Sequence, residues 1–153
     1  MAVKKIPAGF RTVTPFLLVE RCPEFIAFLK KAFGAKVTFQ MKGADGKVMH
    51  AEIKIGDSMV MTSEAQGDWK AMPSMIHLYV TDVDAWHKKA VKAGGKPLRE
   101  PEDQFYGDRS GGIVDAWGNQ WWTATHIKDV SPREMTKGMK EFAKKQAENK
   151  PAS

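Results

Sequence analysis

An internal repeat is the feature that most limits what this chain can fold into. Landmark residues recur at a spacing of about 61 positions, and they mark the same kind of structural boundary in both halves. The matched pairs are Val19 with Val80, Gly34 with Gly95, and Gly56-Asp57 with Gly118-Asn119. Because chance rarely keeps three landmarks at a nearly constant offset, the pattern predicts duplication of one supersecondary unit.

The first half is predicted to contain a strand, a helix and three further strands. Apolar side chains between Phe25 and Phe33 recur at helical spacing, Pro23 suits the first helical turn, and Gly34 suits the stop. Short apolar runs flank this helix, and Gly56-Asp57 predicts a hairpin turn. The expected elements are a strand at 14–19, a helix at 23–33, and strands at 37–41, 48–55 and 59–62.

The second half repeats this order. Residues 81–84 form a capping-box-like helix start, and Gly94-Gly95 suits the end of that helix. The expected elements are a strand at 75–80, a helix reaching 93, a short strand at 96–99, a polar loop, and strands at 112–117 and 121–125. The two halves together predict an α+β fold made of tandem βαβββ modules.

A further helix is predicted after the repeat, over residues 131–147. Ser131 and Glu134 form a capping box with Pro132 at the first helical position, and Met135, Met139 and Phe142 mark one face. We expect this face to dock on the domain body or on a partner chain. Binding to a membrane or to a calmodulin-type protein is the alternative.

Composition favours a single soluble domain. The 153 residues are 42% hydrophobic, enough for one sizeable core, and no apolar run approaches the roughly 20 residues of a membrane span. Cys22 is the only cysteine, so no internal disulfide can form. The N-terminus has no apolar stretch behind Lys4 and Lys5 and does not resemble a signal peptide. We therefore expect a cytoplasmic protein with no membrane partner.

The net charge of +6 resides at the two ends of the chain. Residues 1–11 carry three basic and no acidic side chains, and residues 128–153 carry seven basic against four acidic ones. The segment between them is balanced. A neutral body with basic ends lacks the concentrated basic stripe that nucleic-acid binding requires, so we expect no nucleic-acid partner.

Motifs in the second half resemble those of a known family. The segment from Tyr106-Gly107-Asp108-Arg109 to Ala124-Thr125-His126 resembles the signature of the PhnB-like branch of the vicinal oxygen chelate superfamily. That superfamily includes glyoxalase I, extradiol dioxygenases and bleomycin-resistance proteins. The resemblance covers roughly residues 12–135, and Ala116-Trp117 departs from the usual Pro-aromatic pair. It implies that each module curls into half of an open, barrel-like mixed sheet, and that two halves enclose a cavity.

The expected domain organisation follows from the repeat and the resemblance. Residues 1–11 form an N-terminal tail, and residues 12–130 form one vicinal oxygen chelate domain, whose modules span about 12–65 and 73–127. The amphipathic C-terminal helix follows, and residues 148–153 form a second tail. The resemblance also implies a homodimer, because members of this superfamily commonly build the cavity at or near a dimer interface.

The resemblance further implies four metal-ligand positions, on the first and last strands of each module. They match about Thr14, Glu52, Met75 and Trp122, where the family enzymes usually have His or Glu. Only Glu52 suits a catalytic Zn, Ni, Fe or Mn ion, because thioether is a soft ligand and indole is not a ligand. We therefore expect neither a metal nor another cofactor.

Alternation along the strands selects the side chains that face the predicted cavity. Leu17, Val19, Leu78 and Val80 share the opposite parity and are aliphatic, as expected of the side that faces a helix. Arg109 is added because a guanidinium can clamp an anionic ligand, although an ion pair with Asp108 is its structural alternative. The predicted ligand-binding residues are Phe16, Leu18, His50, Glu52, His77, Tyr79, Arg109 and Trp122.

This set favours non-covalent binding of a small planar or partly aromatic molecule in an apolar cavity, as in the bleomycin-resistance proteins and without turnover. A metal-dependent lyase, isomerase or dioxygenase is the alternative, with His50, Glu52 and His77 holding Ni, Zn, Mn or Fe in a rearranged site. In that case His77 would be a ligand rather than a hydrogen-bonded structural residue. A third possibility is a degenerate module that only dimerises or binds another protein.

Overall fold

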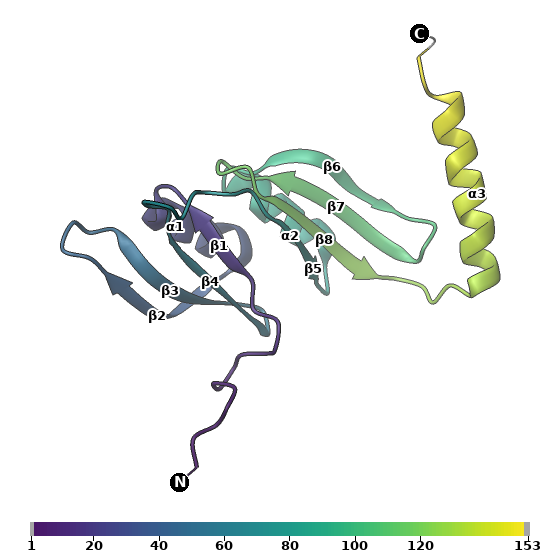
Figure 1. The fold of residues 1–153 in the computed structure, drawn as a ribbon. Helices are drawn as coiled ribbons and strands as arrows, with labels where there is room; N and C mark the ends of the chain where they lie inside the picture. Colours follow the sequence, from purple (N-terminus) through teal and green to yellow (C-terminus); the bar gives the residue numbers. More distant parts are fainter. Residues whose placement is uncertain (1, 152–153) are drawn as a thin grey trace.

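In the computed structural model, which describes residues 2–151, the chain forms two similar units followed by a helix (Figure 1). The first unit consists of β1 (Phe16–Val19), α1 (Cys22–Phe33), β2 (Lys36–Lys42), β3 (Val48–Ile55) and β4 (Ser58–Glu64). The second consists of β5 (Met75–Tyr79), α2 (Val83–Lys92), β6 (Lys96–Asp103), β7 (Asp108–Val114) and β8 (Gln120–His126). Helix α3 spans Pro132–Glu148. The predicted tails include residues 1 and 152–153, which lie outside the described residues.

Each unit forms its own four-stranded sheet, and the two sheets have the same topology. The strand orders are β1-β4-β3-β2 and β5-β8-β7-β6, with the first and last strands of each unit in parallel. Phe16 lies opposite Met61, and His77 lies opposite Trp122. The second pair follows the first by the same offset of about 61 positions that relates the sequence landmarks. The predicted α+β fold of tandem βαβββ modules with a C-terminal helix is confirmed. The two sheets stay separate, and residues 2–151 form no closed barrel.

A side chain from the last strand of each unit stabilises the start of its helix. The Glu64 carboxylate on β4 accepts hydrogen bonds from the backbone N–H groups of Arg21 (2.7 Å) and Cys22 (2.9 Å). At the equivalent place, the Thr125 hydroxyl on β8 accepts from the N–H of Val83 at 2.9 Å. Because the first N–H groups of a helix have no intrahelical acceptor, these contacts satisfy them and fix each helix against its sheet.

The two units share one hydrophobic core around their helices. Helix α1 buries seven residues, whereas α2 buries three. Across the boundary between the units, the rings of Phe25 and Trp117 lie 5.1 Å apart, and the Phe33 ring contacts those of both Trp86 and Trp121. Aromatic packing of this kind buries large apolar areas, so it holds the two units together without a shared sheet.

The largest difference from the prediction concerns β6 and β7. The sequence predicts a strand at 96–99, a polar loop, and a strand at 112–117, but β6 continues to Asp103 and β7 begins at Asp108. Residues 115–117 lie in the turn before β8 instead. Because β6 is the outermost strand of its sheet, prolines and charged residues can face solvent there, and this composition resembles that of a loop.

Helix α3 extends away from both sheets (Figure 1). Its capping box is present, because the Ser131 hydroxyl accepts from the N–H of Glu134 while the Glu134 carboxylate accepts from the N–H of Ser131. The Glu134 carboxylate accepts hydrogen bonds from the N–H and the hydroxyl of Ser131 and from Lys128, and these lower the pKa of Glu134 from 4.5 to about 2. Phe105 packs over Gly138 and lies 5.7 Å from the ring of Phe142. No helix in residues 2–151 is both long and apolar enough to cross a membrane.

Candidate functional site

Each sheet has one face packed against the helices, and we call the opposite face its open face. Leu17 and Val19 on β1 belong to the core, as their parity predicts. Phe16, on the open face of the same strand, is 44% exposed, and Tyr79 on β5 is 67% exposed. Each open face thus presents an exposed aromatic side chain, and uncovered apolar surface of this kind indicates a binding surface.

The open face of the first sheet carries four of the predicted ligand residues. His50 and Glu52 on β3 approach to 3.7 Å between imidazole nitrogen and carboxylate oxygen. The Phe16 ring lies 5.9 Å from that of His50, and Leu18 is buried beside them. Phe39 on β2 pairs with Glu52 and lies 6.3 Å from His50. Sequence reasoning missed Phe39, although strand alternation on β2 could have selected it.

The open face of the second sheet carries three more of the predicted residues. The rings of His77 and Tyr79 on β5 lie 4.8 Å apart, and Trp122 on β8 pairs with His77. The Trp122 indole lies across Gly112 of β7, where an added Cβ would come within 2.6 Å of the ring. The guanidinium of Arg99 on β6 lies 5.0 Å from the indole centre. Sequence reasoning missed Arg99 because its place depends on how β6 pairs with β7.

A hydrogen-bonded chain runs along the end of this open face. The Tyr79 hydroxyl donates to Asp108 at 2.9 Å, and Asp108, only 4% exposed, also bonds Nδ1 of His126 at 2.8 Å. The Nε2 of His126 contacts Asp129 at 2.9 Å. Hydrogen bonds from Asp129 and then Asp108 raise the pKa of His126, which favours the imidazolium. Asp108 also raises the pKa of Tyr79, which favours the protonated phenol.

The motif that begins at Tyr106 is anchored to the end of β8. Gly107 has a φ of +94°, and a Cβ there would clash with the carbonyl oxygen of Lys128. The Gly107 carbonyl accepts from the N–H groups of Ile127 and Lys128. The two motifs of the family resemblance therefore form one connected corner, held together by the backbone and by the bond between Asp108 and His126.

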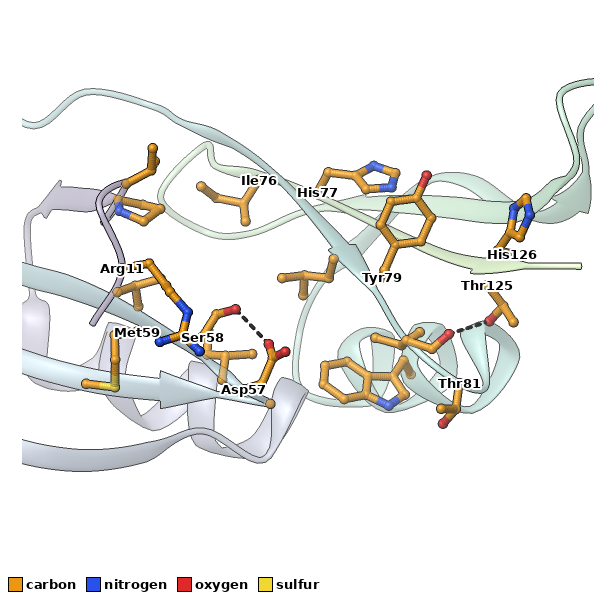
Figure 2. A pocket seen from close by; sticks show the side chains of 18 residues that line it. Arg11, Asp57, Ser58, Met59, Ile76, His77, Tyr79, Thr81, Thr125 and His126 are labelled. Atoms are coloured by element: carbon orange, nitrogen blue, oxygen red, sulfur yellow. Dashed lines mark hydrogen bonds between the residues drawn. The ribbon is translucent and has the colours of Figure 1, made fainter. Parts of the chain in front are cut away.

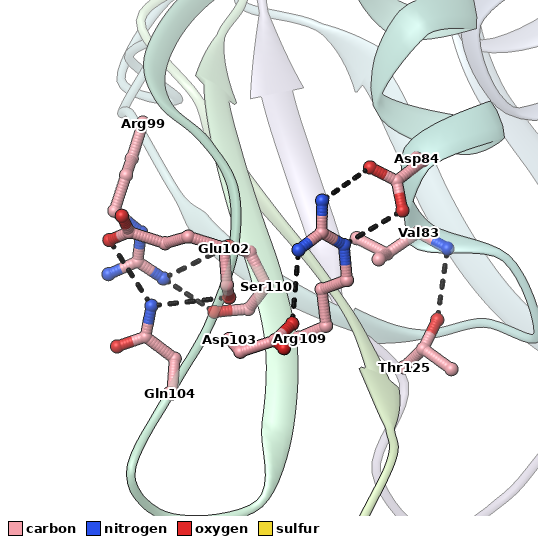
Figure 3. A network of polar contacts seen from close by, with 9 residues as sticks. All are labelled: Val83, Asp84, Arg99, Glu102, Asp103, Gln104, Arg109, Ser110 and Thr125. Atoms are coloured by element: carbon pink, nitrogen blue, oxygen red, sulfur yellow. Dashed lines mark hydrogen bonds and ion pairs between the residues drawn. The ribbon is translucent and has the colours of Figure 1, made fainter.

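Arg109 lies on the helix side of β7, apart from the other predicted ligand residues. Its guanidinium donates two hydrogen bonds to Asp84, at 2.8 and 2.9 Å, and one to Asp103 at 3.0 Å (Figure 3). These bonds raise the pKa of Arg109 and lower that of Asp84. The structure thus corrects the expected orientation, because neighbouring residues on a strand point to opposite faces and Asp108 takes the open one. The predicted pair with Asp108 is replaced by one with Asp84.

A groove of about 1060 Å³ lies between the two units, which remain joined by their shared core. It follows the edge of β5 that faces away from β8 (Figure 2). His77, Tyr79 and His126 line it together with aliphatic residues of β5 and the ring of Trp86. Ser58 and Met59 contribute to the opposite wall. An apolar groove with a few convergent polar groups is typical of a small-molecule site.

Within one chain, the predicted set is divided between the two sheets. His50 and Glu52 share the first open face, and His77 belongs to the second. In the part of the chain that the structure describes, no group of three His, Cys, Asp or Glu side chains is placed to hold a metal ion. The alternative site of His50, Glu52 and His77 is therefore not assembled within one chain.

The family's metal-ligand positions also shift by one strand. Glu52 lies on β3 rather than on the last strand of its unit, and the residue that matches Trp122 is Met61 on β4. The matched positions are then Thr14, Met61, Met75 and Trp122. A hydroxyl, two thioethers and an indole are not the donor set of a hard divalent ion, so these residues do not fit a glyoxalase-type metal.

Comparison with known proteins agrees with this architecture. The chain is 33% identical over 150 residues to an uncharacterized protein of Mycobacterium bovis, covering 91% of this chain and 96% of that protein. TioX from Micromonospora sp. ML1 has a similar fold, with a TM-score of 0.63 at 19% identity over 75% of this chain and 99% of that one. A structure described as a putative 3-demethylubiquinone-9 3-methyltransferase, PhnB protein, from Bacillus cereus has a TM-score of 0.60 at 15% identity, with 75% and 99% covered.

A family model spans most of both units. It is described as the Glyoxalase/Bleomycin resistance protein/Dioxygenase superfamily, and it matches residues 11–123. The match begins before β1 and ends within β8, so it includes most of both open faces and most of the groove lining, but not Thr125 and His126. The chain therefore belongs to the glyoxalase/bleomycin resistance protein/dioxygenase superfamily.

Proposed function

We propose that this protein binds a small planar or partly aromatic molecule non-covalently, without a metal ion and without turnover. The observation that carries the proposal is the make-up of the two open faces, where aromatic side chains surround a few oriented polar groups. At the family's metal-ligand positions stand residues with hydroxyl, thioether and indole groups. Binding that only sequesters a molecule requires affinity and no further chemistry.

Stacking supplies the main attraction in this proposal. Phe16 and Phe39 offer rings on the first open face, and Tyr79 and Trp122 offer rings on the second. Each well-placed aromatic pair contributes about 0.5–1.5 kcal/mol beyond the burial of its area. His50 with Glu52 on one face, and the chain that ends at Tyr79 on the other, would orient the bound molecule.

We further propose that the working unit is a homodimer, in which the first open face of one chain meets the second open face of its partner. Within one chain the two sheets are separate and lie side by side (Figure 1). Large apolar side chains remain uncovered on both, including Met41 at 51% exposed and Met75 at 69% exposed. Covering such surface favours association, since exposed apolar patches commonly mark interaction sites.

The first experiment tests metal content and ligand binding together. Untagged protein is incubated with Ni, Zn, Mn or Fe, dialysed and analysed for bound metal, and then titrated with the planar dye proflavine by dye anisotropy. We expect no stoichiometric metal, and saturable binding that a chelator does not change. Phe16→Ala and Trp122→Ala should each weaken binding, whereas Met139→Ala on the remote helix α3 should not. One metal per chain that is lost in Glu52→Gln would instead support the metal-dependent enzyme.

Mixing two variants tests whether two chains build the site. Phe16→Ala damages only the first open face, and Trp122→Ala damages only the second. If the faces meet between chains, a heterodimer of the two variants contains one intact site, so mixing and re-annealing should restore tighter binding than either variant has alone. Sedimentation equilibrium measures the dimer itself. A monomer that binds dye, or a mixture that restores nothing, would contradict the shared site.

A further inference from the structure

The hydrogen bond between Tyr79 and Asp108 determines how the phenol of Tyr79 can interact with a ligand. The hydroxyl donates its single hydrogen to Oδ2 of Asp108 at 2.9 Å. Asp108 is almost fully buried, and its other oxygen bonds Nδ1 of His126 at 2.8 Å. A phenol has one O–H hydrogen and lone pairs on the same oxygen. With its hydrogen engaged, the Tyr79 oxygen can only accept a further hydrogen bond.

Tyr79 is placed where a ligand can reach this oxygen. The side chain belongs to the second open face, borders the groove between the units and is 67% exposed, although its hydroxyl is bonded. Figure 2 shows its ring between the side chains of His77 and His126, with the hydroxyl pointing away from the backbone of β5. The phenol oxygen is therefore an oriented acceptor beside two exposed aromatic rings.

The neighbouring charges also favour a hydrogen-bond donor on the ligand. Asp108 and Asp129 flank His126, so this corner keeps one excess negative charge even when the imidazole is protonated. Arg109 follows Asp108 in the chain, but it points to the other face of the sheet and is paired with Asp84 and Asp103. A group that donates a hydrogen bond is therefore favoured beside Tyr79 over one that only accepts.

We propose that the molecule bound at this site presents an N–H or O–H donor to the phenol oxygen of Tyr79. The ligand class is then planar molecules with a peripheral amino, amide or hydroxyl group, rather than planar hydrocarbons or ring systems whose edge carries only acceptors. This inference rests on the proposed function and specifies the ligand of that same site.

Two related dyes test the inference. Proflavine and acridine orange are both planar acridine cations at neutral pH, and both carry the protonated ring N–H. Proflavine has two free amino groups where acridine orange has dimethylamino groups, so the pair differs only in these exocyclic donors. Dissociation constants are measured by dye anisotropy at equal salt for wild type and two variants. Tyr79→Phe removes the acceptor oxygen and keeps the ring. Tyr106→Phe removes the other tyrosine hydroxyl of the chain, which lies 3.5 Å from Ser110.

The wild type should bind proflavine more tightly than acridine orange by about 3- to 10-fold, which corresponds to one net hydrogen bond. The preference should disappear in Tyr79→Phe and persist in Tyr106→Phe. If it came from the size of the methyl groups, it would persist in Tyr79→Phe as well. Circular dichroism melting of each variant checks that the fold is kept.

The outcomes separate the two proposals. Equal affinity of the wild type for both dyes, or a preference that survives in Tyr79→Phe, would overturn the inference and leave the planar-ligand function standing. Failure of the wild type to bind either dye saturably would contradict the proposed function itself. The wild-type comparison needs no variant, so the inference can fail even if Tyr79→Phe does not fold.

Discussion

The two units share one topology, but different interactions stabilise the side of each sheet that faces its helix. Val48 on β3 and Arg109 on β7 occupy matched positions, paired with Lys42 and Asp103 respectively. Val48 is fully buried in the core, whereas Arg109 forms ion pairs with Asp84 and Asp103. The comparison teaches that strand pairing and helix docking maintain the βαβββ unit, while the same site can hold a buried aliphatic or a paired guanidinium.

The open faces differ as well. The first presents Phe16, Phe39 and one pair of ionisable residues, His50 with Glu52. The second carries a hydrogen-bonded chain that begins at Tyr79. One face thus offers mainly apolar contact and the other adds directional polar groups, and a ligand enclosed between such faces would be both buried and oriented.

The largest expected loss of stability comes from replacing matched aromatic residues on the two helices. Phe25 is fully buried on α1, and Trp86 is the partly exposed residue at the matched position on α2. Phe25→Ala should lower the free energy of unfolding by about 3–5 kcal/mol, because it leaves a cavity in the core. Trp86→Ala should cost less. Urea denaturation at one protein concentration measures both. An equal loss for the two variants would show that the second unit depends on its core as much as the first.

Substituting matched glycines in the two hairpins should cause the next largest loss of stability. Gly46 and Gly107 both have positive φ, at +80° and +94°. Gly46 has open space around it, whereas a Cβ on Gly107 would clash with the carbonyl of Lys128. Gly46→Ala should cost about 1–2 kcal/mol from the backbone conformation alone, and Gly107→Ala about 1–3 kcal/mol more from overpacking. Thermal melts of both variants check the order, and equal melting temperatures would contradict it.

Removing the side chains that support the helix starts should have a smaller effect. Glu64→Ala leaves the N–H groups of both Arg21 and Cys22 without their charged acceptor. Thr125→Val removes a neutral hydroxyl that accepts from the N–H of Val83 and donates to the carbonyl of Val80. Each change should destabilise the protein by about 0.5–2 kcal/mol, with Glu64→Ala the larger. The control is Glu64→Gln, which keeps one acceptor oxygen and should cost less than Glu64→Ala. Urea denaturation distinguishes these variants.

The smallest expected effect is a pH dependence confined to the second unit. His126 has a pKa raised above its ordinary 6.5 by Asp129 and Asp108. Its stabilising contribution is therefore complete below pH 6.5 and is lost as the pH rises through the raised pKa of the folded protein. The difference in melting temperature between wild type and His126→Gln should be largest at acidic pH and shrink toward alkaline pH. A difference that does not change with pH would contradict this assignment.

Much of the fold can be predicted from local sequence features. The repeat, the helix between Pro23 and Gly34, and the parity that places Leu17 in the core and Phe16 on the open face all follow from periodicity and helix-end signals. These signals involve residues close together in the chain. Only the first half of the charged outer strand β6, residues 96–99, is predicted, because the solvent-facing residues of its second half have the composition of a loop.

The candidate site could be predicted only in part, because its polar contacts join distant segments. Tyr79 and Asp108 are 29 positions apart, and Arg109 and Asp84 are 25 apart. Spacing selects Tyr79, but it does not show that a buried carboxylate holds its hydroxyl. Arg109 is selected by the chemistry of its guanidinium rather than by spacing, and strand pairing turns its side chain to the helix side.

The sequence by itself determined the duplicated βαβββ fold and the division of strands such as β1 and β5 into a core face and an open face, because both depend on periods of two and 3.6 residues along the chain. Only the tertiary structure decided which residues meet across the strands. Pairing put Met61 rather than Glu52 at the position that matches Trp122, and it separated His77 from His50 and Glu52. The physical reason is that the hydrophobic pattern selects which face of a strand is buried, whereas bulges and pairing between distant segments decide which residues stand opposite each other.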